Sequence, residues 1–370
     1  MAAVSSSIVH LTMRFGSTVL SIGTGMLYED SGQHFIVTAW HNVTGLHPET
    51  LKHLSPTGAI PDNVVVRLVV RFPGIGTQRM AIILPLIGEN ESLFYIHPKN
   101  WPRIDVVAIP FDPKADHPCE FYMGDGSVKK ASVNLLGMAT EKGLKTEICP
   151  VQQFLLPNRA VVQSWIESVD VTEELFIPGY PHNVSDDHVQ PVWKRATIAS
   201  SVQGGWNREP KFLVDSASKS GMSGSPVFYY NPNGEVRILG RTHRFTEEVA
   251  ILAGVYVGRI GVTKEADPQI GTVWHRSVID EIIEGKSMER LPAEIEVSPR
   301  NLESEINKAL STCSQRGLEN VNNPDLPSRH YLQHRILETV NGRASPKRVL
   351  DEILIIARHY NGPLVPDDEA

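Results

Sequence analysis

The segment Ser220-Gly-Met-Ser-Gly-Ser-Pro226 is the most informative part of this chain, and it runs directly into the apolar segment Val227–Tyr230. A serine flanked by glycines on a tight turn, ahead of a buried strand, has an exposed hydroxyl and backbone N–H groups that can converge on one point. An activated nucleophile needs both features. The segment therefore predicts Ser223 as a nucleophile, with the N–H groups of Gly221 and Ser223 as donors to an oxyanion. An ordinary Gly/Ser turn is the alternative interpretation.

A histidine ends the β-branched segment Phe35-Ile-Val-Thr-Ala-Trp-His41. Imidazole titrates near neutral pH, so it can accept a hydroxyl proton and return it to a leaving group. Most of the 14 histidines must be surface or core residues. His41 differs from them because it ends a buried-looking strand, where its side chain can face a cleft. The pattern predicts His41 as a general base.

The segment Arg103-Ile-Asp-Val-Val-Ala-Ile109 places a carboxylate, Asp105, inside an apolar strand. Burying a charge without a partner is costly, so this carboxylate needs a cation or several hydrogen-bond donors. A histidine N–H is one suitable partner. A position at the strand edge, capped by Arg103 or by backbone amides, satisfies the carboxylate equally well.

The pattern along the chain favours a mainly β protein. From Ser7 to about Val262, short segments rich in Val, Ile, Thr and aromatic residues are bounded by Gly, Pro, Asn and Asp, as in an antiparallel barrel or sandwich. The sequence further predicts a hairpin of Val227–Tyr230 with Val236–Leu239, and a closing helix over 277–284 with Ser277 as N-cap. Beyond a linker at 286–298, it predicts a helical bundle with helices at Pro299–Cys313, Leu332–Asn341 and Pro346–Tyr360.

Composition argues against several functions. The net charge of -7, from 35 basic and 42 acidic residues, comes without a basic block, so we expect no nucleic-acid partner. The three cysteines, at 119, 149 and 313, fit neither a disulfide framework nor a zinc site and favour a reducing compartment. No apolar run of about 18 residues and no signal-peptide pattern occurs, so we expect a cytoplasmic protein off the membrane. No cofactor or metal is predicted, and the loop His182–His188 is interpreted as solvated.

The order His41, Asp105, Ser223, each in its local context, resembles the trypsin-like serine peptidases of the chymotrypsin fold. The resemblance covers roughly residues 8 to 285. Within it, the segments Gly23–Met26 and Ile177–Pro181 are similar to the bacterial and organelle-type branch of the family. Five motifs carry it: Thr38–His41 for T-A-x-H, Asp105–Ala108 for D-[IVL]-A-L, Gly221–Pro226 for G-[DN]-S-G-G-P, Gly23–Met26 for G-[ST]-G-F, and Ile177–Pro181 for G-Y-P.

This resemblance implies two six-stranded antiparallel β-barrels, at about 8–115 and 150–262, within a peptidase domain at 1–285. His41 and Asp105 would come from the first barrel and Ser223 from the second, with the cleft between them. It also implies that Asp105 fixes the tautomer of His41 and that Gly221 and Ser223 form the oxyanion hole. The chain then ends in the helical domain at 299–370, which would recruit a protein partner.

Departures from the family pattern bear on control and specificity. Met222 stands where digestive members carry an aspartate that pairs with a newly cut N-terminus, and Asn42 replaces the cysteine that follows the histidine in secreted members. In the family, Ala217 would lie at the base of the substrate pocket, and Val257 and Gly258 would form its wall. A neutral base favours small or medium apolar side chains before the cut, although Asp215 lies two residues earlier.

Two functions of different classes follow from the sequence. The first is a regulated serine endopeptidase of restricted specificity acting on protein or peptide substrates. Its helical tail loosely resembles adaptor domains of bacterial conflict systems, from which we form the hypothesis of a role in antiviral defence. The second is a pseudo-protease that binds peptides without cleaving them.

Overall fold

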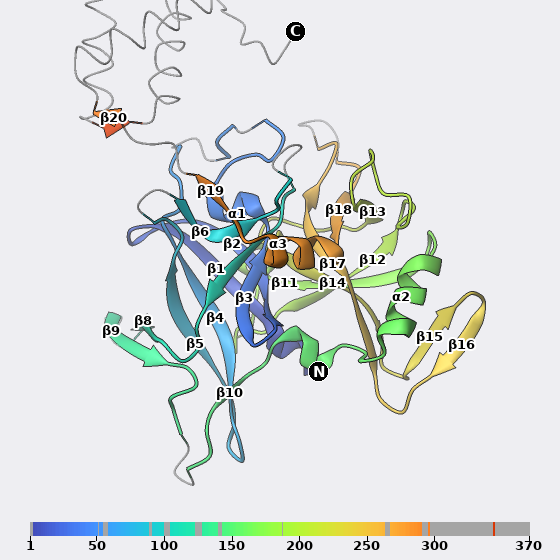
Figure 1. Ribbon diagram of the computed structural model, residues 1–370, viewed down its shortest axis with the longest axis horizontal. Coiled ribbons are helices and arrows are strands. Elements are labelled where there is room, and N and C mark those ends of the chain that lie inside the picture. Colours follow the sequence, from blue (N-terminus) through green and yellow to red (C-terminus); the bar gives the residue numbers. More distant parts are fainter. Residues whose placement is uncertain are drawn as a thin grey trace, which may run out of the picture. The chain divides into compact units, whose positions relative to one another are not determined.

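The computed structural model describes residues 3–50, 52–54, 58–88, 91–99, 104–122, 128–139, 143–186, 188–262, 267–290, 295–296 and 343–344 (Figure 1). The chain divides into two compact units, Met1–Glu289 and Arg290–Ala370. In the second unit the structure describes one antiparallel pair, β20 (Ile295–Glu296) with β21 (Arg343–Ala344). The predicted helical bundle lies outside the described residues.

The second half of the larger unit is a closed, six-stranded antiparallel barrel, which confirms one of the two predicted barrels. Along its strands the residues are either alternately or continuously buried, because their apolar side chains fill the barrel interior. The last of its strands along the chain, Ile270–His275, lies beyond Val262, the predicted end of this barrel. In order around the barrel, the strands are β11 (Glu174–Gly179), β12 (Val192–Ile198), β13 (Lys211–Asp215), β18 (Ile270–His275), β17 (Val249–Arg259) and β14 (Ser225–Asn231).

The first half is a nine-stranded antiparallel sheet, and the six-stranded barrel predicted at about 8–115 is not shown. Among the described residues no pairing joins the strand Gly76–Pro85 at one end of this sheet to the strand Ser287–Arg290 at the other. The order is β10 (Glu147–Ile148), β4 (Asn63–Phe72), β1 (Ile8–Phe15), β2 (Thr18–Asp30), β3 (Gln33–Thr38), β7 (Val107–Phe111), β6 (Glu91–Ile96) and β19 (Ser287–Arg290), with β5 (Gly76–Pro85) paired to β4.

The predicted hairpin of 227–230 with 236–239 is wrong. The turn is present, since the N–H of Gly234 donates to the carbonyl of Asn231 at 3.3 Å. However, β14 pairs with β17, whereas β15 (Glu235–Ile238) pairs with β16 (Arg241–Arg244). The side chains of β15 pack in the same cluster as Trp165 of α2 (Arg159–Ser168), a helix that the sequence pattern did not predict.

Two-stranded and helical segments complete the described chain. The closing helix is confirmed as α3 (Ser277–Gly285), although Ser277 is its first helical residue and Arg276 its N-cap. The predicted linker contains β19, which is paired to the nine-stranded sheet. The remaining elements are β8 (Asp116–Tyr122) paired with β9 (Val128–Asn134), α1 (Trp40–Thr44), and the 3-10 turns η1 (Ala3–Ser7), η2 (Val151–Phe154) and η3 (Pro181–Asn183).

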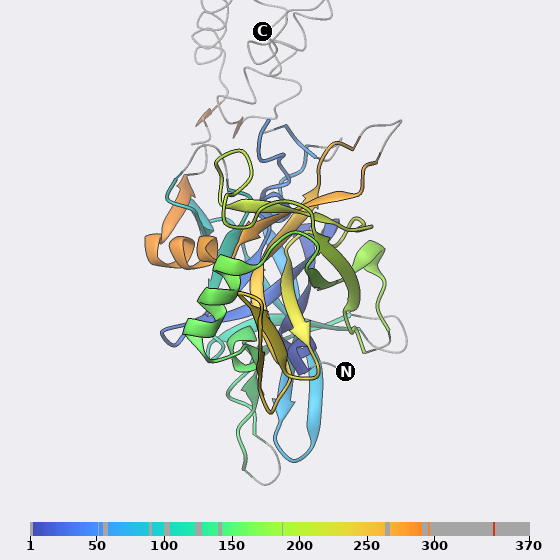
Figure 2. The same cartoon turned by 90° about the vertical axis from the view of Figure 1, so that its right-hand side faces the viewer.

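The sheet and the barrel lie side by side (Figure 1 and Figure 2) and share one apolar cluster of buried side chains. Val37 and Val106 contribute from the sheet side, Phe228 and Val255 from the barrel, and Ile279 from α3, all fully buried. Because the cluster is continuous, it fixes the ends of β3 and β17 relative to each other. No helix in the part of the chain that the structure describes is long and apolar enough to cross a membrane.

Candidate active site

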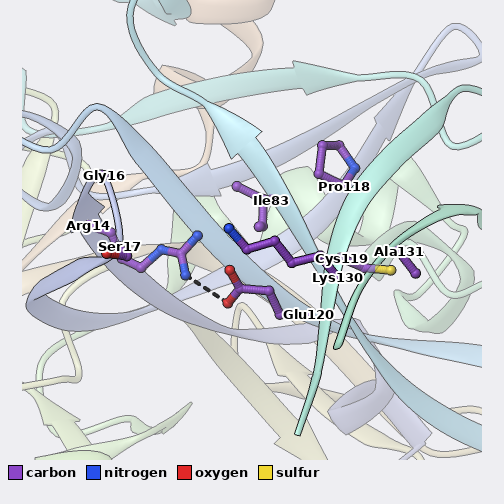
Figure 3. Close-up of a pocket in the computed structure, with 9 residues that line it drawn as sticks. All are labelled: Arg14, Gly16, Ser17, Ile83, Pro118, Cys119, Glu120, Lys130 and Ala131. Carbon is purple, nitrogen blue, oxygen red and sulfur yellow. Dashed lines mark hydrogen bonds and ion pairs between the residues drawn. The ribbon is translucent and has the colours of Figure 1, made fainter. Parts of the chain in front are cut away.

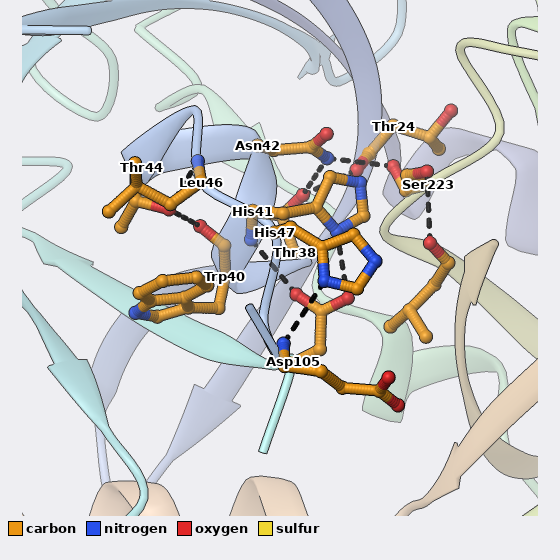
Figure 4. Close-up of polar contacts among 12 residues, drawn as sticks. Thr24, Thr38, Trp40, His41, Asn42, Thr44, Leu46, His47, Asp105 and Ser223 are labelled. Carbon is orange, nitrogen blue, oxygen red and sulfur yellow. Dashed lines mark hydrogen bonds and ion pairs between the residues drawn. The ribbon is translucent and has the colours of Figure 1, made fainter. Parts of the chain in front are cut away.

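His41 lies in the first turn of α1, directly after the buried strand β3. The helix is only five residues long because Gly45 follows it with a left-handed φ of 66°. A short helix at the end of a strand projects the imidazole away from the core, and the side chain is 16% exposed. The structure thus places His41 just beyond the end of β3, between Asp105 and Ser223 (Figure 4).

Asp105 lies between β6 and β7 and binds His41 with both carboxylate oxygens. Its Oδ1 accepts the backbone N–H of His41 at 2.9 Å, and its Oδ2 lies 2.7 Å from the ring Nδ1. The carboxylate is nearly buried, with the residue 4% exposed. An ionised carboxylate can only accept, so Nδ1 carries the proton and Nε2 is the ring nitrogen able to accept another. Two bonds to one residue also fix the ring plane.

Electrostatics at this pair favour the protonated imidazole. Burial lowers the pKa of His41, but the charge of Asp105 and the hydrogen bond to it together raise that pKa above its ordinary value. His41 is therefore a stronger proton acceptor than an isolated buried imidazole. Nε2 has no hydrogen-bond partner among the residues that the structure describes.

Ser223 lies on the loop between β13 and β14, on the side of the His41 ring away from Asp105 (Figure 4). Its carbonyl accepts from the N–H of Thr24 at 3.0 Å and from the amide Nδ2 of Asn42 at 2.9 Å. Its hydroxyl donates to the carbonyl of Val257 at 3.1 Å and makes no bond to His41 in the described structure. The three predicted residues are thus gathered, with the hydroxyl turned toward the barrel.

The carbonyl of Val257 is available because β17 has a bulge there. Tyr256 pairs with Val273 and Gly258 with Thr272, so that Val257 has no partner on β18. A bulged residue leaves its ladder groups unpaired and free for other contacts. The hydroxyl of Ser223 donates to one of these groups, the carbonyl of Val257.

In the loop at 216–224, the N–H groups of Gly221 and Ser223 have no acceptor among the described residues, and the same holds for the exposed residues Ala217, Lys219 and Ser220. The intervening and following N–H groups are engaged: Met222 donates to Lys219 O at 3.2 Å, and Gly224 to Tyr256 O at 2.7 Å. The N–H groups of Gly221 and Ser223, on alternate residues beside the serine hydroxyl, are thus available to donate to another acceptor.

Of the three residues predicted for the substrate pocket, Ala217 lies in this loop, and Val257 and Gly258 lie on β17. Ala217 is exposed, Val257 is 8% exposed, and a Cβ built on Gly258 would meet no atom within 4 Å. Sequence reasoning missed the pair beneath them, in which the buried hydroxyls of Ser218 and Tyr256 are hydrogen-bonded to each other. Burial raises the pKa of Tyr256, so the pair is neutral at physiological pH.

Sequence reasoning also missed Thr24, although the glycines on either side of it were a visible signal. Small neighbours allow a close backbone approach, and a Cβ on Gly23 would lie 2.6 Å from Asn42 Nδ2. Asn42 was noted for its place after the histidine, without a contact assigned to it. In the structure its Nδ2 joins Thr38 Oγ1, at 3.0 Å, to Ser223.

A separate cavity of about 230 Å³ lies between the β1–β2 hairpin and the β8–β9 pair (Figure 3). Arg14 and Glu120 form an ion pair of 2.9 Å within it, so its buried charges satisfy each other. No group of three metal-ligating side chains occurs among the described residues. The cavity is lined by Arg14, Gly16, Ser17, Ile83, Pro118, Cys119, Glu120, Lys130 and Ala131.

No protein-family model and no curated protein matches this chain. Among solved structures, the chain is similar to Rv3671c from M. tuberculosis H37Rv in its inactive form, with 12% identity over 77% of this chain and 88% of that one and a TM-score of 0.36. It is similar to a serine endoprotease from Yersinia pestis, with 12% identity, 76% and 62% coverage and a TM-score of 0.37. The protease Anisep from Arthrobacter nicotinovorans shares 11% identity over 76% and 95% of the chains, with a TM-score of 0.36. Likenesses at this level do not establish a family.

Proposed function

We propose that this chain is a serine endopeptidase, with Ser223 as nucleophile and His41 as general base. One observation carries the proposal. A buried carboxylate binds the ring Nδ1 of His41 with one oxygen and the backbone N–H of His41 with the other, and among the described residues the ring Nε2 is left unengaged beside Ser223, near the unpaired N–H groups of Gly221 and Ser223. Each part has a use in acyl transfer.

The reaction begins when the hydroxyl of Ser223 turns from Val257 toward Nε2 of His41. Its oxygen attacks the peptide carbonyl carbon while its proton passes to Nε2. The carbonyl electron pair moves onto oxygen, where the N–H groups of Gly221 and Ser223 stabilise the negative charge. The imidazolium, stabilised by Asp105, protonates the leaving amine. Water then attacks the acyl-enzyme by the same route and releases the carboxylic acid.

We propose the substrate preference and the regulation of the enzyme from the residues of the same site. We expect small or medium apolar residues before the cut, because Ala217 and Val257 carry no charge and the Ser218–Tyr256 pair is neutral. A resting hydroxyl bonded to Val257 supports a regulated enzyme of restricted specificity. From the sequence pattern we also propose that residues 299–370 bind a protein partner and that the protein is cytoplasmic. We further propose that it uses no cofactor and acts in antiviral defence.

A fluorophosphonate probe tests the nucleophile. The serine oxygen displaces fluoride and forms a stable phosphonate ester, which mass spectrometry locates. We expect labelling of the wild type at Ser223 and none of Ser223→Ala. The matched control, Ser17→Ala, removes an exposed serine elsewhere and keeps wild-type labelling. Equal labelling of wild type and Ser223→Ala would refute the proposal.

A peptide-binding pseudo-protease is the second candidate, and the bond from the Ser223 hydroxyl to Val257 favours it. In that case the hydroxyl stays on the barrel and no acyl-enzyme forms. Peptide binding would then be unchanged in His41→Ala, with no covalent adduct in the wild type. Covalent labelling at Ser223 that is lost in His41→Ala decides for the enzyme.

A further inference from the structure

Thr24 binds two carbonyl groups of the nucleophile loop from the opposite half of the domain. Its hydroxyl donates to the carbonyl of Gly221 at 2.7 Å, and its N–H donates to the carbonyl of Ser223 at 3.0 Å. It lies on β2, in the nine-stranded sheet, and its side chain is fully buried. One residue of the sheet thus contacts the loop on both sides of Met222.

The other polar atoms of Thr24 are occupied, which fixes the direction of its hydroxyl. Its Oγ1 accepts from the N–H of Tyr180 at 3.1 Å, and its carbonyl accepts from the hydroxyl of Thr38 at 2.7 Å. Because a backbone N–H can only donate, the Thr24 hydroxyl must give its own proton to Gly221. The loop carbonyl therefore has a donor that cannot turn elsewhere.

The peptide planes that carry the two unpaired N–H groups are each anchored at their carbonyl end. The carbonyl of Ser220 accepts from the N–H of His182 at 2.7 Å, and that of Met222 from Ser225 at 3.0 Å. In a trans peptide the N–H points opposite to the carbonyl, so these two bonds fix the direction of both N–H groups. The peptide between these two planes is anchored by Thr24 and by Lys219.

The loop needs this anchor because Gly221 has little conformational preference of its own. Its φ is 93°, and glycine adopts positive and negative φ almost equally well, so the neighbouring peptides can turn over at small cost. A Cβ at this position would overlap the carbonyl oxygen of Tyr180, which excludes every other residue. The orientation must therefore come from outside the loop.

We infer that Thr24 is a positioning residue, whose hydroxyl holds the Gly221 and Ser223 N–H groups in the orientation that binds the oxyanion. The inference rests on the proposed function. Without the hydroxyl, the carbonyl of Gly221 and the N–H of Tyr180 are both buried and unpaired, a state that favours rearrangement of the loop. Loss of one oxyanion donor slows acyl transfer about 10²–10³-fold.

The test uses the full-length protein and the rate of phosphonylation of Ser223 by the fluorophosphonate probe. Thr24→Val keeps the shape of the side chain and removes the hydroxyl, and we expect a rate at least about tenfold lower. Thr24→Ser keeps the hydroxyl and should stay within about threefold of wild type. The matched control is Thr146→Val, which removes a buried hydroxyl that donates to Leu135 O at 2.6 Å, and its rate should equal that of wild type. If Thr24→Val does not fold, Thr24→Ala replaces it.

A second measurement separates positioning from general disruption. In a Ser223→Cys background, iodoacetamide alkylates the thiolate at position 223 by displacing iodide, and no oxyanion forms. Adding Thr24→Val should leave this alkylation rate unchanged. Equal slowing of alkylation and phosphonylation, or equal phosphonylation of wild type and Thr24→Val, would overturn the inference and leave Ser223 as nucleophile. A wild type that is never labelled would overturn the proposed function and this inference with it.

Discussion

His10 is a buried histidine that its neighbours hold in the neutral form. It lies on β1, is 3% exposed, and has Nε2 2.7 Å from Asn183 Oδ1 and Nδ1 3.2 Å from Arg67 Nη1. A guanidinium only donates, so Nδ1 accepts and Nε2 carries the single proton. Burial lowers the pKa of His10 to about 4, and the charges of Arg67 and Arg79 add to it against the hydrogen bond to Asn183.

This shift makes stability depend on pH in a definite direction. Between the ordinary pKa of 6.5 and about 4, the unfolded chain binds a proton at His10 that the folded chain does not. The stability from this group is therefore complete above pH 6.5 and is lost as pH falls toward 4. At 1.36 kcal/mol per pKa unit, the full effect is about 3 kcal/mol, of which about 2 kcal/mol is lost by pH 5.

His10→Gln isolates this effect. A glutamine amide can donate to Asn183 and accept from Arg67, but it does not titrate. Urea unfolding of both proteins at pH 7.5 and pH 5, followed by tryptophan fluorescence, gives each free energy of unfolding. We expect the wild type to lose about 2 kcal/mol more than the variant over this interval. The same loss in both proteins would refute the assignment of a neutral, buried His10.

Two further substitutions test the site and its packing. Asp105→Asn should slow fluorophosphonate labelling on the order of 10³–10⁴-fold at pH 7, because the amide no longer fixes the tautomer of His41. Since Asp105 raises the pKa of His41, the acidic limb of the rate profile should also move to lower pH, and an unmoved limb would contradict this role. Gly224→Ala should cost at least about 2 kcal/mol in urea unfolding, because its φ is 88° and a Cβ would overlap the carbonyl oxygen of Thr24. Gly16→Ala, with a φ of 57° but open space around it, is the control and should cost about 1 kcal/mol; equal losses would contradict the overlap.

Local pattern predicted the elements around the site better than it predicted how strands pair. The strand before His41 follows from its β-branched composition, and the helix beginning at Ser277 follows from helical spacing, each within a few residues. The pairing of β14 with β17 depends instead on residues about twenty positions away, so a favourable Asn-Gly turn did not decide it. The extension of the first sheet by β10 and β19 depends on still more distant contacts.

Helix α2 shows a second limit of sequence pattern. Its buried residues are only Val162 and Trp165, too few for a periodic signal within a β-rich region. Asn158 caps it by accepting from the N–H of Val161 at 3.1 Å, and that cap was the one visible signal. The helix is stabilised mainly by Trp165, which packs 5.3 Å from the ring of Tyr229.

In the candidate site, residue types and their order were predictable, whereas the contact of the Ser223 hydroxyl was not. That contact depends on the bulge at Val257, which is a property of the pairing between β17 and β18. It also depends on Thr24 and Asn42, which hold the serine carbonyl from the other half of the domain. None of these dependences is local in sequence.

The bond between Ser223 and Val257 is weak enough to be compatible with catalysis. A neutral hydrogen bond contributes about 0.5–1.5 kcal/mol net, and turning the hydroxyl toward His41 replaces it with a bond to Nε2. Even without that replacement, the cost would reduce the rate only about tenfold, far less than loss of the oxyanion donors. In the proposed mechanism the bulge therefore provides a resting position for the hydroxyl, and we expect the orientation of the Gly221–Met222 peptide, which Thr24 holds, to have the greater effect on turnover.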